Sequence, residues 1–140
     1  MAKIVKEFEV RASPARVFAA VANPEKYPLW AVFVKAATSR GPKAHWVYEI
    51  NGLQVESDTE ETVREADRLF GFRQTAGFLK SGVTRLEIRP TRKGSSVVWT
   101  NLYVFPYSYL GNLMDKLRAQ EQFEEGMDKS IVRLKALLER

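Results

Sequence analysis

The chain of 140 residues contains no cysteine and only one histidine, His45. Without cysteine there is no disulfide, no thiolate nucleophile and no cysteine-ligated zinc or iron–sulfur site. With a single histidine, a metal site would need mostly carboxylate ligands, and a Ser-His-Asp triad has no supporting context. We therefore expect neither a metal nor a cofactor. The lack of cysteine also fits a cytoplasmic protein.

Long apolar runs and phosphate-binding motifs are missing as well. No stretch of about 18 apolar residues could span a bilayer, and the start, MAKIVKEFEV, alternates charge with hydrophobe, unlike the core of a signal peptide. The motifs G-x-x-x-x-G-K-[ST], G-x-G-x-x-G and H-E-x-x-H do not occur. We expect a cytoplasmic protein with no integral membrane association, no nucleotide-phosphate cradle and no zinc-protease chemistry.

The composition is that of an ordinary globular protein, with 45% hydrophobic and 28% charged residues. Its length suits one domain over residues 1–140. The net charge of +5 arises entirely in the second half of the chain, residues 71–140, which contains twelve basic and seven acidic residues. Residues 1–70 contain ten of each. Because these basic residues are scattered among acids, we expect no nucleic acid partner. Contact of the basic half with a membrane surface or a macromolecule stays open.

The first thirty residues predict a strand and two short helices. Residues 6–12 alternate polar with apolar side chains, as a half-buried strand does. Ser13 is then expected to cap the N-terminus of a helix and Pro14 to occupy its first position. Asn23 and Pro24 are expected to do the same for a second helix. Tyr27-Pro28 is expected to end the second helix.

Residues 31–105 predict six antiparallel strands, because turn signals leave connections too short for parallel crossovers. Asn51-Gly52 is the strongest hairpin signal among them. The strands are expected at about 31–39, 44–50, 53–65, 68–76, 82–90 and 95–105.

Residues 108–139 predict one long amphipathic helix. Its apolar stripe is interrupted where Gln120 and Glu124 occupy stripe positions, and Gly126 lies beside the interruption. We expect a kink there, or a segment whose polar side chains face a cavity.

The order of elements indicates an α+β protein with the helix-grip fold: a curved seven-stranded antiparallel sheet wraps around a long C-terminal helix, with two short helices after the first strand. The opening SPARVFAAVANPEKYPLW and the ending GMDKSIVRLKALLER resemble the polyketide cyclase and START-like (SRPBCC) superfamily over essentially the whole chain. The resemblance implies a tunnel between sheet and helix. Its motifs are architectural, so they say more about fold than about function.

Large apolar side chains with polar tips are abundant, and such residues can line a small-molecule cavity as well as form core. Asn101, between Trp99 and Tyr103, is the expected polar handle. A hairpin tip at Phe78-Leu79 is expected near an entrance. The candidate ligand-binding residues are Tyr27, Trp30, Phe33, Trp46, Tyr48, Phe70, Phe72, Trp99, Asn101, Tyr103, Leu113, Leu117 and Gln120.

Few residues offer acid–base chemistry. Glu56, Asp58 and Glu60 share one face of a predicted strand, which we interpret as the wet side of the sheet, and His45 is expected to point away from the apolar face of its own strand. Glu61 falls on the other face and would point inward unless a bulge intervenes. Glu61 and Tyr103 are the candidate catalytic residues.

Three functions remain open. The first is a binding or transfer protein for a small hydrophobic molecule such as a lipid, an isoprenoid quinone or a polyketide-like aromatic. The second is an aromatase or cyclase that uses an inward Glu or Tyr as acid or base without a metal. The third is a protein-interaction module, as in the chaperone-activator and ribosome-associating branches of the superfamily. We favour binding over catalysis because binding requires none of the missing residues; a homodimer is left open.

Overall fold

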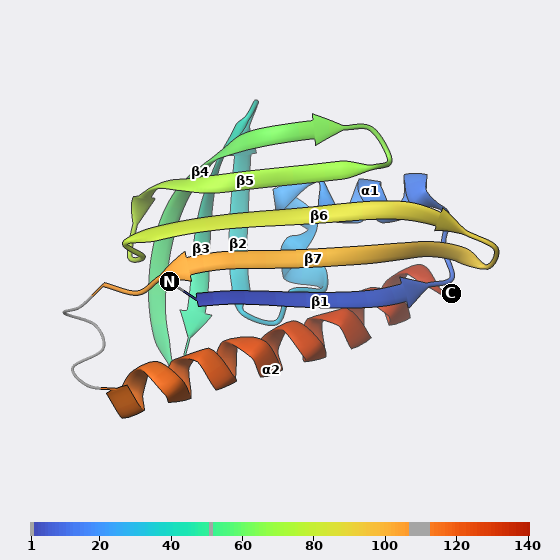
Figure 1. Cartoon of the computed structure of the whole chain (residues 1–140). Helices are drawn as coiled ribbons and strands as arrows, with labels where there is room; N and C mark the ends of the chain where they lie inside the picture. The colour runs from blue at the N-terminus through green and yellow to red at the C-terminus, as the bar shows by residue number, and fades with distance from the viewer. Residues whose placement is uncertain (1, 51, 107–112) are drawn as a thin grey trace.

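The computed structural model describes residues 2–50, 52–106 and 113–140, without the side chains of residues 113–117. The chain has the predicted helix-grip architecture, in which a curved antiparallel sheet faces a long C-terminal helix (Figure 1). Its elements are β1 (Ala2–Val10), α1 (Pro14–Val21), the 3₁₀ helix η1 (Pro24–Leu29), β2 (Val34–Arg40), β3 (Lys43–Ile50), β4 (Leu53–Glu65), β5 (Leu69–Gly77), β6 (Ser81–Thr91), β7 (Gly94–Val104) and α2 (Leu113–Leu138).

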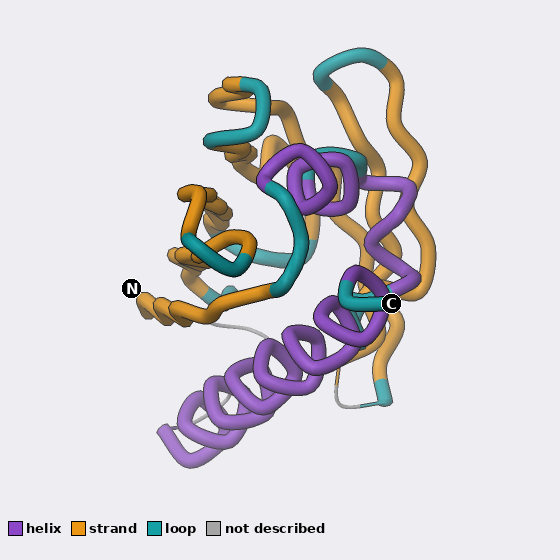
Figure 2. The backbone as a smooth tube through the Cα atoms, turned by 90° about the vertical axis from the view of Figure 1, so that its right-hand side faces the viewer, coloured by secondary structure: helices purple, strands orange, loops and turns teal. Residues whose placement is uncertain are grey.

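The seven strands follow the order β1-β7-β6-β5-β4-β3-β2, so that every consecutive pair from β2 to β7 is a neighbour and β1 joins the far edge beside β7. Ile50 pairs with Leu53 across the predicted Asn51-Gly52 hairpin, although Asn51 itself lies outside the described residues. Figure 2 shows the two ends of the curved sheet on opposite sides of the molecule, with the helices between them. The concave face of the sheet therefore surrounds the core.

The connection between η1 and β2 is the main departure from the predicted strand boundaries. Residues 31–33 form a turn, not a strand, because the amides of Trp30 and Ala31 both donate to the carbonyl of Tyr27, and the amide of Val34 donates to Ala31. Trp30 and Ala31 are completely buried. The burial of these two side chains in the core favours the turn over sheet pairing.

The corner that contains α1 and η1 is built by its caps, as predicted. The Ser13 hydroxyl accepts from the amide of Arg16, and the Asn23 side chain accepts from the amide of Glu25. The prediction that Pro28 ends the second helix is wrong by one residue, since η1 runs to Leu29.

The helix α2 runs unbroken from Leu113 to Leu138, so the sequence interruption produces no break. Its buried face after residue 118 consists of Ala119, Met127, Ser130, Leu134 and Leu138. Gly126 permits close packing, because a Cβ there would lie 3.3 Å from the ring of Phe33. The Ser130 hydroxyl donates to the Gly126 carbonyl at 2.6 Å and accepts from the amide of Val32 at 2.9 Å. These contacts fix the η1–β2 turn against the helix.

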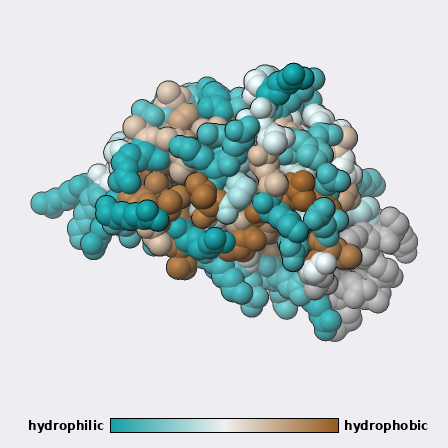
Figure 3. All heavy atoms as spheres, turned by 180° about the vertical axis from the view of Figure 1, so that it is seen from behind, coloured by the Kyte–Doolittle hydropathy of each residue, from teal (hydrophilic) through white to brown (hydrophobic). Residues whose placement is uncertain are grey.

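Some large apolar side chains reach the surface. Figure 3 shows apolar atoms in a band across the face opposite to the view of Figure 1, mixed with polar atoms. The exposed large hydrophobic residues among those described are Val5, Leu29, Val32, Leu53, Val83 and Val132. Within the described ranges, no helix has both the length and the hydropathy needed to cross a membrane. A homodimer remains a prediction.

Candidate functional site

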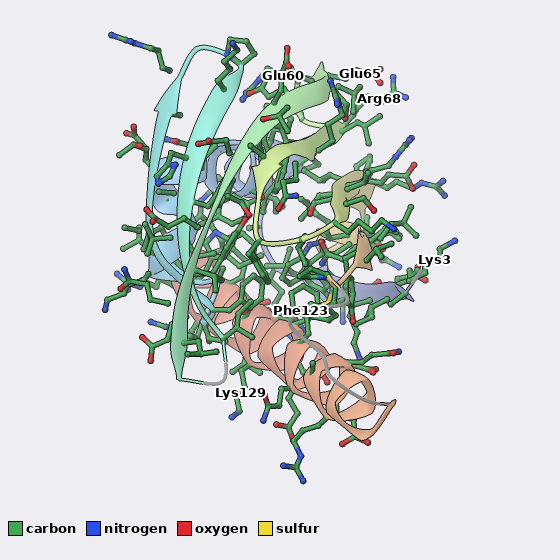
Figure 4. All side chains as sticks on the ribbon, turned by 90° about the vertical axis from the view of Figure 1, so that its left-hand side faces the viewer. Lys3, Glu60, Glu65, Arg68, Phe123 and Lys129 are labelled. Carbon is green, nitrogen blue, oxygen red and sulfur yellow. The ribbon has the colours of Figure 1, made fainter. Side chains whose placement is uncertain are left out.

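A cavity of about 80 Å³ lies between the concave face of the sheet and α2. This is several times the 10–15 Å³ or so that one water molecule needs, and less than the roughly 300–1,000 Å³ of typical ligand pockets. Figure 4 shows Phe123 between α2 and the sheet. The lining comprises Tyr27, Phe33, Val34, Trp46, Tyr48, Ile50, Phe72, Phe78, Leu79, Gly82, Val83, Thr84, Trp99, Asn101, Leu102, Tyr103, Phe105 and Phe123.

Aromatic rings form a continuous wall around this cavity. Trp46 stacks on Phe72 with centroids 5.1 Å apart and meets the edge of Tyr27 at 4.9 Å. On the opposite side, Phe123 lies 5.1 Å from both Phe33 and Tyr103. Rings at these separations attract one another in tilted or edge-to-face geometry. The two Phe123 contacts thus join this wall to α2.

Most polar groups in the wall are satisfied inside the protein. The Trp46 indole N–H donates to Thr59 Oγ1 at 2.7 Å. Asn101, which is 6% exposed, accepts from Thr84 Oγ1 at 2.6 Å and donates to Met127 Sδ at 3.5 Å. Asn101 therefore stands in the wall as a fixed group and links β6, β7 and α2.

Two polar groups of β7 differ from these. Trp99 Nε1 and the Tyr103 hydroxyl are buried and have no hydrogen-bond partner among the described residues. Burial, with a smaller contribution from nearby Glu124, raises the pKa of Tyr103 to about 12. The Tyr103 hydroxyl therefore keeps its proton at neutral pH and can donate it in a hydrogen bond.

The hairpin between β5 and β6 forms one rim of the cavity through Phe78 and Leu79. The Gln74 side chain holds this hairpin: its Nε2 donates to the Leu79 carbonyl at 2.7 Å, and its Oε1 accepts from the Leu79 amide at 3.3 Å. The same oxygen accepts from the Ser57 hydroxyl at 2.8 Å. Gly77 is required beside this contact, because its φ is +142° and a Cβ would come within 2.6 Å of Ser57 Oγ.

Eight of the predicted ligand-binding residues line the cavity: Tyr27, Phe33, Trp46, Tyr48, Phe72, Trp99, Asn101 and Tyr103. Three others lie outside the lining, for different reasons. Trp30 is completely buried below it, with Nε1 donating to the Ala20 carbonyl at 3.4 Å. Phe70 is also completely buried, under the guanidinium of Arg64. Gln120 is half-buried on α2 but does not reach the cavity. The side chains of Leu113 and Leu117 lie outside the described residues.

Glu61, the other candidate acid or base, also lies outside the cavity lining. A register irregularity follows it in the β4–β5 pairing. Its carboxylate, 18% exposed, accepts from Arg64 Nη2 at 2.6 Å, and the same nitrogen donates to the Ala22 carbonyl at 2.7 Å. Glu61 thus anchors an arginine that ties β4 to α1. Of the two candidate catalytic residues, only Tyr103 lines the cavity.

Glu124 does not face the cavity either. It accepts from the ammonium group of Lys6 at 2.8 Å, while Asp128 lies 3.1 Å from the same nitrogen. These hydrogen bonds raise the pKa of Lys6, and the bond to Glu124 has the largest effect. The three side chains join the β1 edge to α2.

The outer face of β3 and β4 is polar, as predicted. His45 contacts a carboxylate at each ring nitrogen, with Nδ1 2.7 Å from Asp58 and Nε2 2.9 Å from Glu56. These hydrogen bonds, the one to Asp58 first, raise the pKa of His45. A groove of about 640 Å³ beside this cluster is lined mostly by polar side chains and is open to solvent. It lacks the apolar lining of a small-molecule site.

The sequence interpretation missed Phe123, which closes the cavity from α2. The signal was present, because Phe123 precedes Met127 by four residues and Ala119 precedes Phe123 by four more, the spacing of one helix face. The predicted stripe runs through Gln120 and Glu124 instead. Ile50, Thr84 and Phe105 were also missed. Ile50 ends β3 and Phe105 follows β7, and at strand ends alternation alone does not separate wall from surface.

The family model described as polyketide cyclase / dehydrase and lipid transport matches residues 1–139. The chain belongs to this family. Solved structures that are less than 25% identical to the chain share its fold over nearly its whole length. TTHA0849 from Thermus thermophilus is 21% identical, with a TM-score of 0.79 over 96% of this chain and 95% of that one.

Two further solved structures share this fold. A START superfamily protein from Mycobacterium smegmatis is 19% identical, with a TM-score of 0.73 over 98% of this chain and 97% of that chain. The di-domain ARO/CYC StfQ of the steffimycin biosynthetic pathway is 12% identical, with a TM-score of 0.79 over 98% of this chain and 50% of its own. No curated protein sequence matches. At these identities the likeness shows the fold alone.

Proposed function

We propose that this family member binds a small, largely apolar molecule in the cavity between the sheet and α2. The observation that carries the proposal is the lining, in which aromatic and aliphatic side chains surround a few placed polar groups. The family description includes lipid transport, which agrees with a role in holding or transferring such a molecule.

The size of the cavity limits the ligand. About 80 Å³ is at most the scale of a single ring, and a molecule of two rings must displace rim side chains. Phe78 and Leu79 on the hairpin and Phe123 on the helix are the side chains in position to move. The proposal therefore favours a compact ring system over a long acyl chain.

Native mass spectrometry of the gently purified protein, together with thermal unfolding in the presence of neutral two-ring compounds, tests this function. A ligand that binds only the folded state raises Tm by mass action. We expect a copurified small molecule or a concentration-dependent rise in Tm for some of the compounds. If no added mass is found and none of the compounds raises Tm, the proposal is contradicted.

Catalysis of the cyclase or dehydrase type is a second candidate, favoured by one observation. Tyr103 offers a protonated, buried hydroxyl in the cavity wall, which would polarise a substrate carbonyl or donate a proton to it once the covering side chains move. The described lining contains no carboxylate or histidine to act as base. Because Glu61 lies outside the lining, Glu61→Gln is expected to leave any turnover intact and Tyr103→Phe to abolish it. Turnover of an aromatic polyketide mimic that survives Tyr103→Phe would remove this candidate.

A further inference from the structure

Two buried donors in the cavity wall lack a partner. Trp99 is 2% exposed and Tyr103 is 5% exposed, and neither the indole N–H nor the hydroxyl meets an acceptor among the described residues. A buried polar group without a hydrogen bond is costly and rare in native proteins. Both residues line the cavity, although the two donor atoms are themselves buried. A bound molecule that displaces the side chains covering these atoms would be in position to satisfy them.

The chemistry of the two groups sets the polarity of that molecule. An indole N–H can only donate a hydrogen bond, and a protonated phenol donates readily. Asn101 lies between them in sequence, and its side-chain oxygen and nitrogen are already engaged by Thr84 and Met127. The Trp99 indole N–H and the Tyr103 hydroxyl are therefore the β7 donors without an acceptor among the described residues. A ligand that satisfies them must carry acceptor atoms such as oxygen.

The lack of charged side chains in the described cavity lining limits the charge of the ligand. Over the part of the chain that the structure describes, the cavity lining contains no lysine, arginine, histidine, aspartate or glutamate. An anionic head would therefore be buried without a counter-charge, which is strongly unfavourable. Glu124, on the helix side, is itself negative and is held by Lys6. A carboxylate or phosphate ligand would be disfavoured for both reasons.

We infer that the cavity selects neutral ring compounds that carry a carbonyl-type oxygen, which accepts a hydrogen bond from Trp99 Nε1 or from the Tyr103 hydroxyl. The inference rests on the proposed binding function and specifies its ligand class. The two residues lie four positions apart, about 13 Å along the strand. A single carbonyl can satisfy either donor, and a molecule with an oxygen at each end can satisfy both.

Three probes of similar size test the inference by isothermal titration calorimetry. They are 2-acetylnaphthalene, which has a neutral acceptor, 2-ethylnaphthalene, which has none, and 2-naphthoate, which is anionic. We expect the ketone to bind about tenfold more tightly than the hydrocarbon, as one added hydrogen bond allows. The naphthoate should bind more weakly than the ketone.

Variants assign the preference to its residues. Tyr103→Phe should reduce the ketone-over-hydrocarbon ratio severalfold, and Trp99→Phe provides the same test at the second donor if Tyr103→Phe fails to fold. Thr100→Val is the matched control, because Thr100 follows Trp99 on β7 with its side chain on the opposite face and lies outside the lining. The control should leave the ratio unchanged.

The outcomes separate the two proposals. If the hydrocarbon and the ketone bind equally, or the naphthoate binds best, the ligand class is wrong while the binding function stands. The ligand class is also wrong if neither Tyr103→Phe nor Trp99→Phe changes the ratio of ketone to hydrocarbon affinity. If none of the three probes binds, the binding function and the ligand class fall together.

Discussion

The ring of Tyr103 on β7 lies against the ring of Phe123 on α2, with their centroids 5.1 Å apart. Phe123 also contacts Phe33 at the same separation. One helix residue thus closes the cavity and joins α2 to both the sheet and the η1–β2 turn. Packing of the helix and shape of the cavity depend on the same side chain.

Replacing this side chain should loosen both. Phe123→Ala removes two ring contacts and is expected to lower the free energy of unfolding by about 2–4 kcal/mol, as large-to-small changes at packed sites do. It should also admit larger ring compounds. Chemical denaturation measures the first effect and calorimetry the second. Val132→Ala, at a position 67% exposed on the same helix, should change stability by less than about 0.5 kcal/mol. Equal effects of both substitutions would show that Phe123 does not hold the helix.

The Gln74 side chain should control the rim hairpin. Gln74→Ala leaves the amide and carbonyl of Leu79 without their side-chain partner. We therefore expect the free energy of unfolding to fall by about 1–2 kcal/mol and hydrogen exchange at the Leu79 amide to become faster. Hydrogen exchange followed by NMR measures this directly. Gln54→Ala is the control, because Gln54 is exposed and makes only a 3.4 Å contact with Lys35. Unchanged exchange at Leu79 would rule out the proposed role of Gln74.

His45 should titrate above its ordinary pKa of 6.5, because Asp58 and Glu56 both bond its charged form. A raised folded-state pKa contributes stability that is fully present below pH 6.5 and is lost as pH rises through the folded value. Since His45 is the only histidine, a one-dimensional proton NMR titration assigns it without ambiguity. Asp58→Asn should lower the midpoint. A midpoint at or below 6.5 in the unaltered protein would contradict the observed pairing.

Tyr103 should ionise near pH 12, well above the ordinary tyrosine pKa of 10.0. The unfolded chain loses this proton first, so the contribution to stability is present below pH 10 and falls as pH rises from about 10 to 12. The difference between the ultraviolet titrations of the unaltered protein and Tyr103→Phe isolates this group from the other tyrosines. A difference curve centred near 10 would mean that the hydroxyl is solvated and not buried in the cavity.

The fold could be predicted from local signals because each acts over a few residues. Ser13-Pro14 and Asn23-Pro24 cap their helices as expected. The alternation through Trp99, Asn101 and Tyr103 puts all three on the inner face, where the structure has them. Such patterns specify which side of an element is buried and where it begins.

The division between core and cavity wall could not be predicted in the same way. Trp30 and Phe70 point inward like Trp46 and Phe72, yet the first two are covered by α1 and the Arg64 contact. Periodicity assigns a face, but distant elements decide whether a ring is covered. The spacing of Ala119, Phe123 and Met127 likewise places Phe123 on the inner face of the helix, but only the contacts with Phe33 and Tyr103 make its ring part of the cavity wall.

Direct occupancy of the cavity is the decisive measurement. Calorimetric titration of 2-acetylnaphthalene into the unaltered protein is compared with titration into Ile50→Trp, in which the larger ring fills space at the cavity wall; circular dichroism verifies that the variant is folded. We predict one-to-one binding to the unaltered protein and loss of that binding in the variant. Equal binding to both proteins, or no binding to the unaltered one, would contradict a ligand site between the sheet and α2.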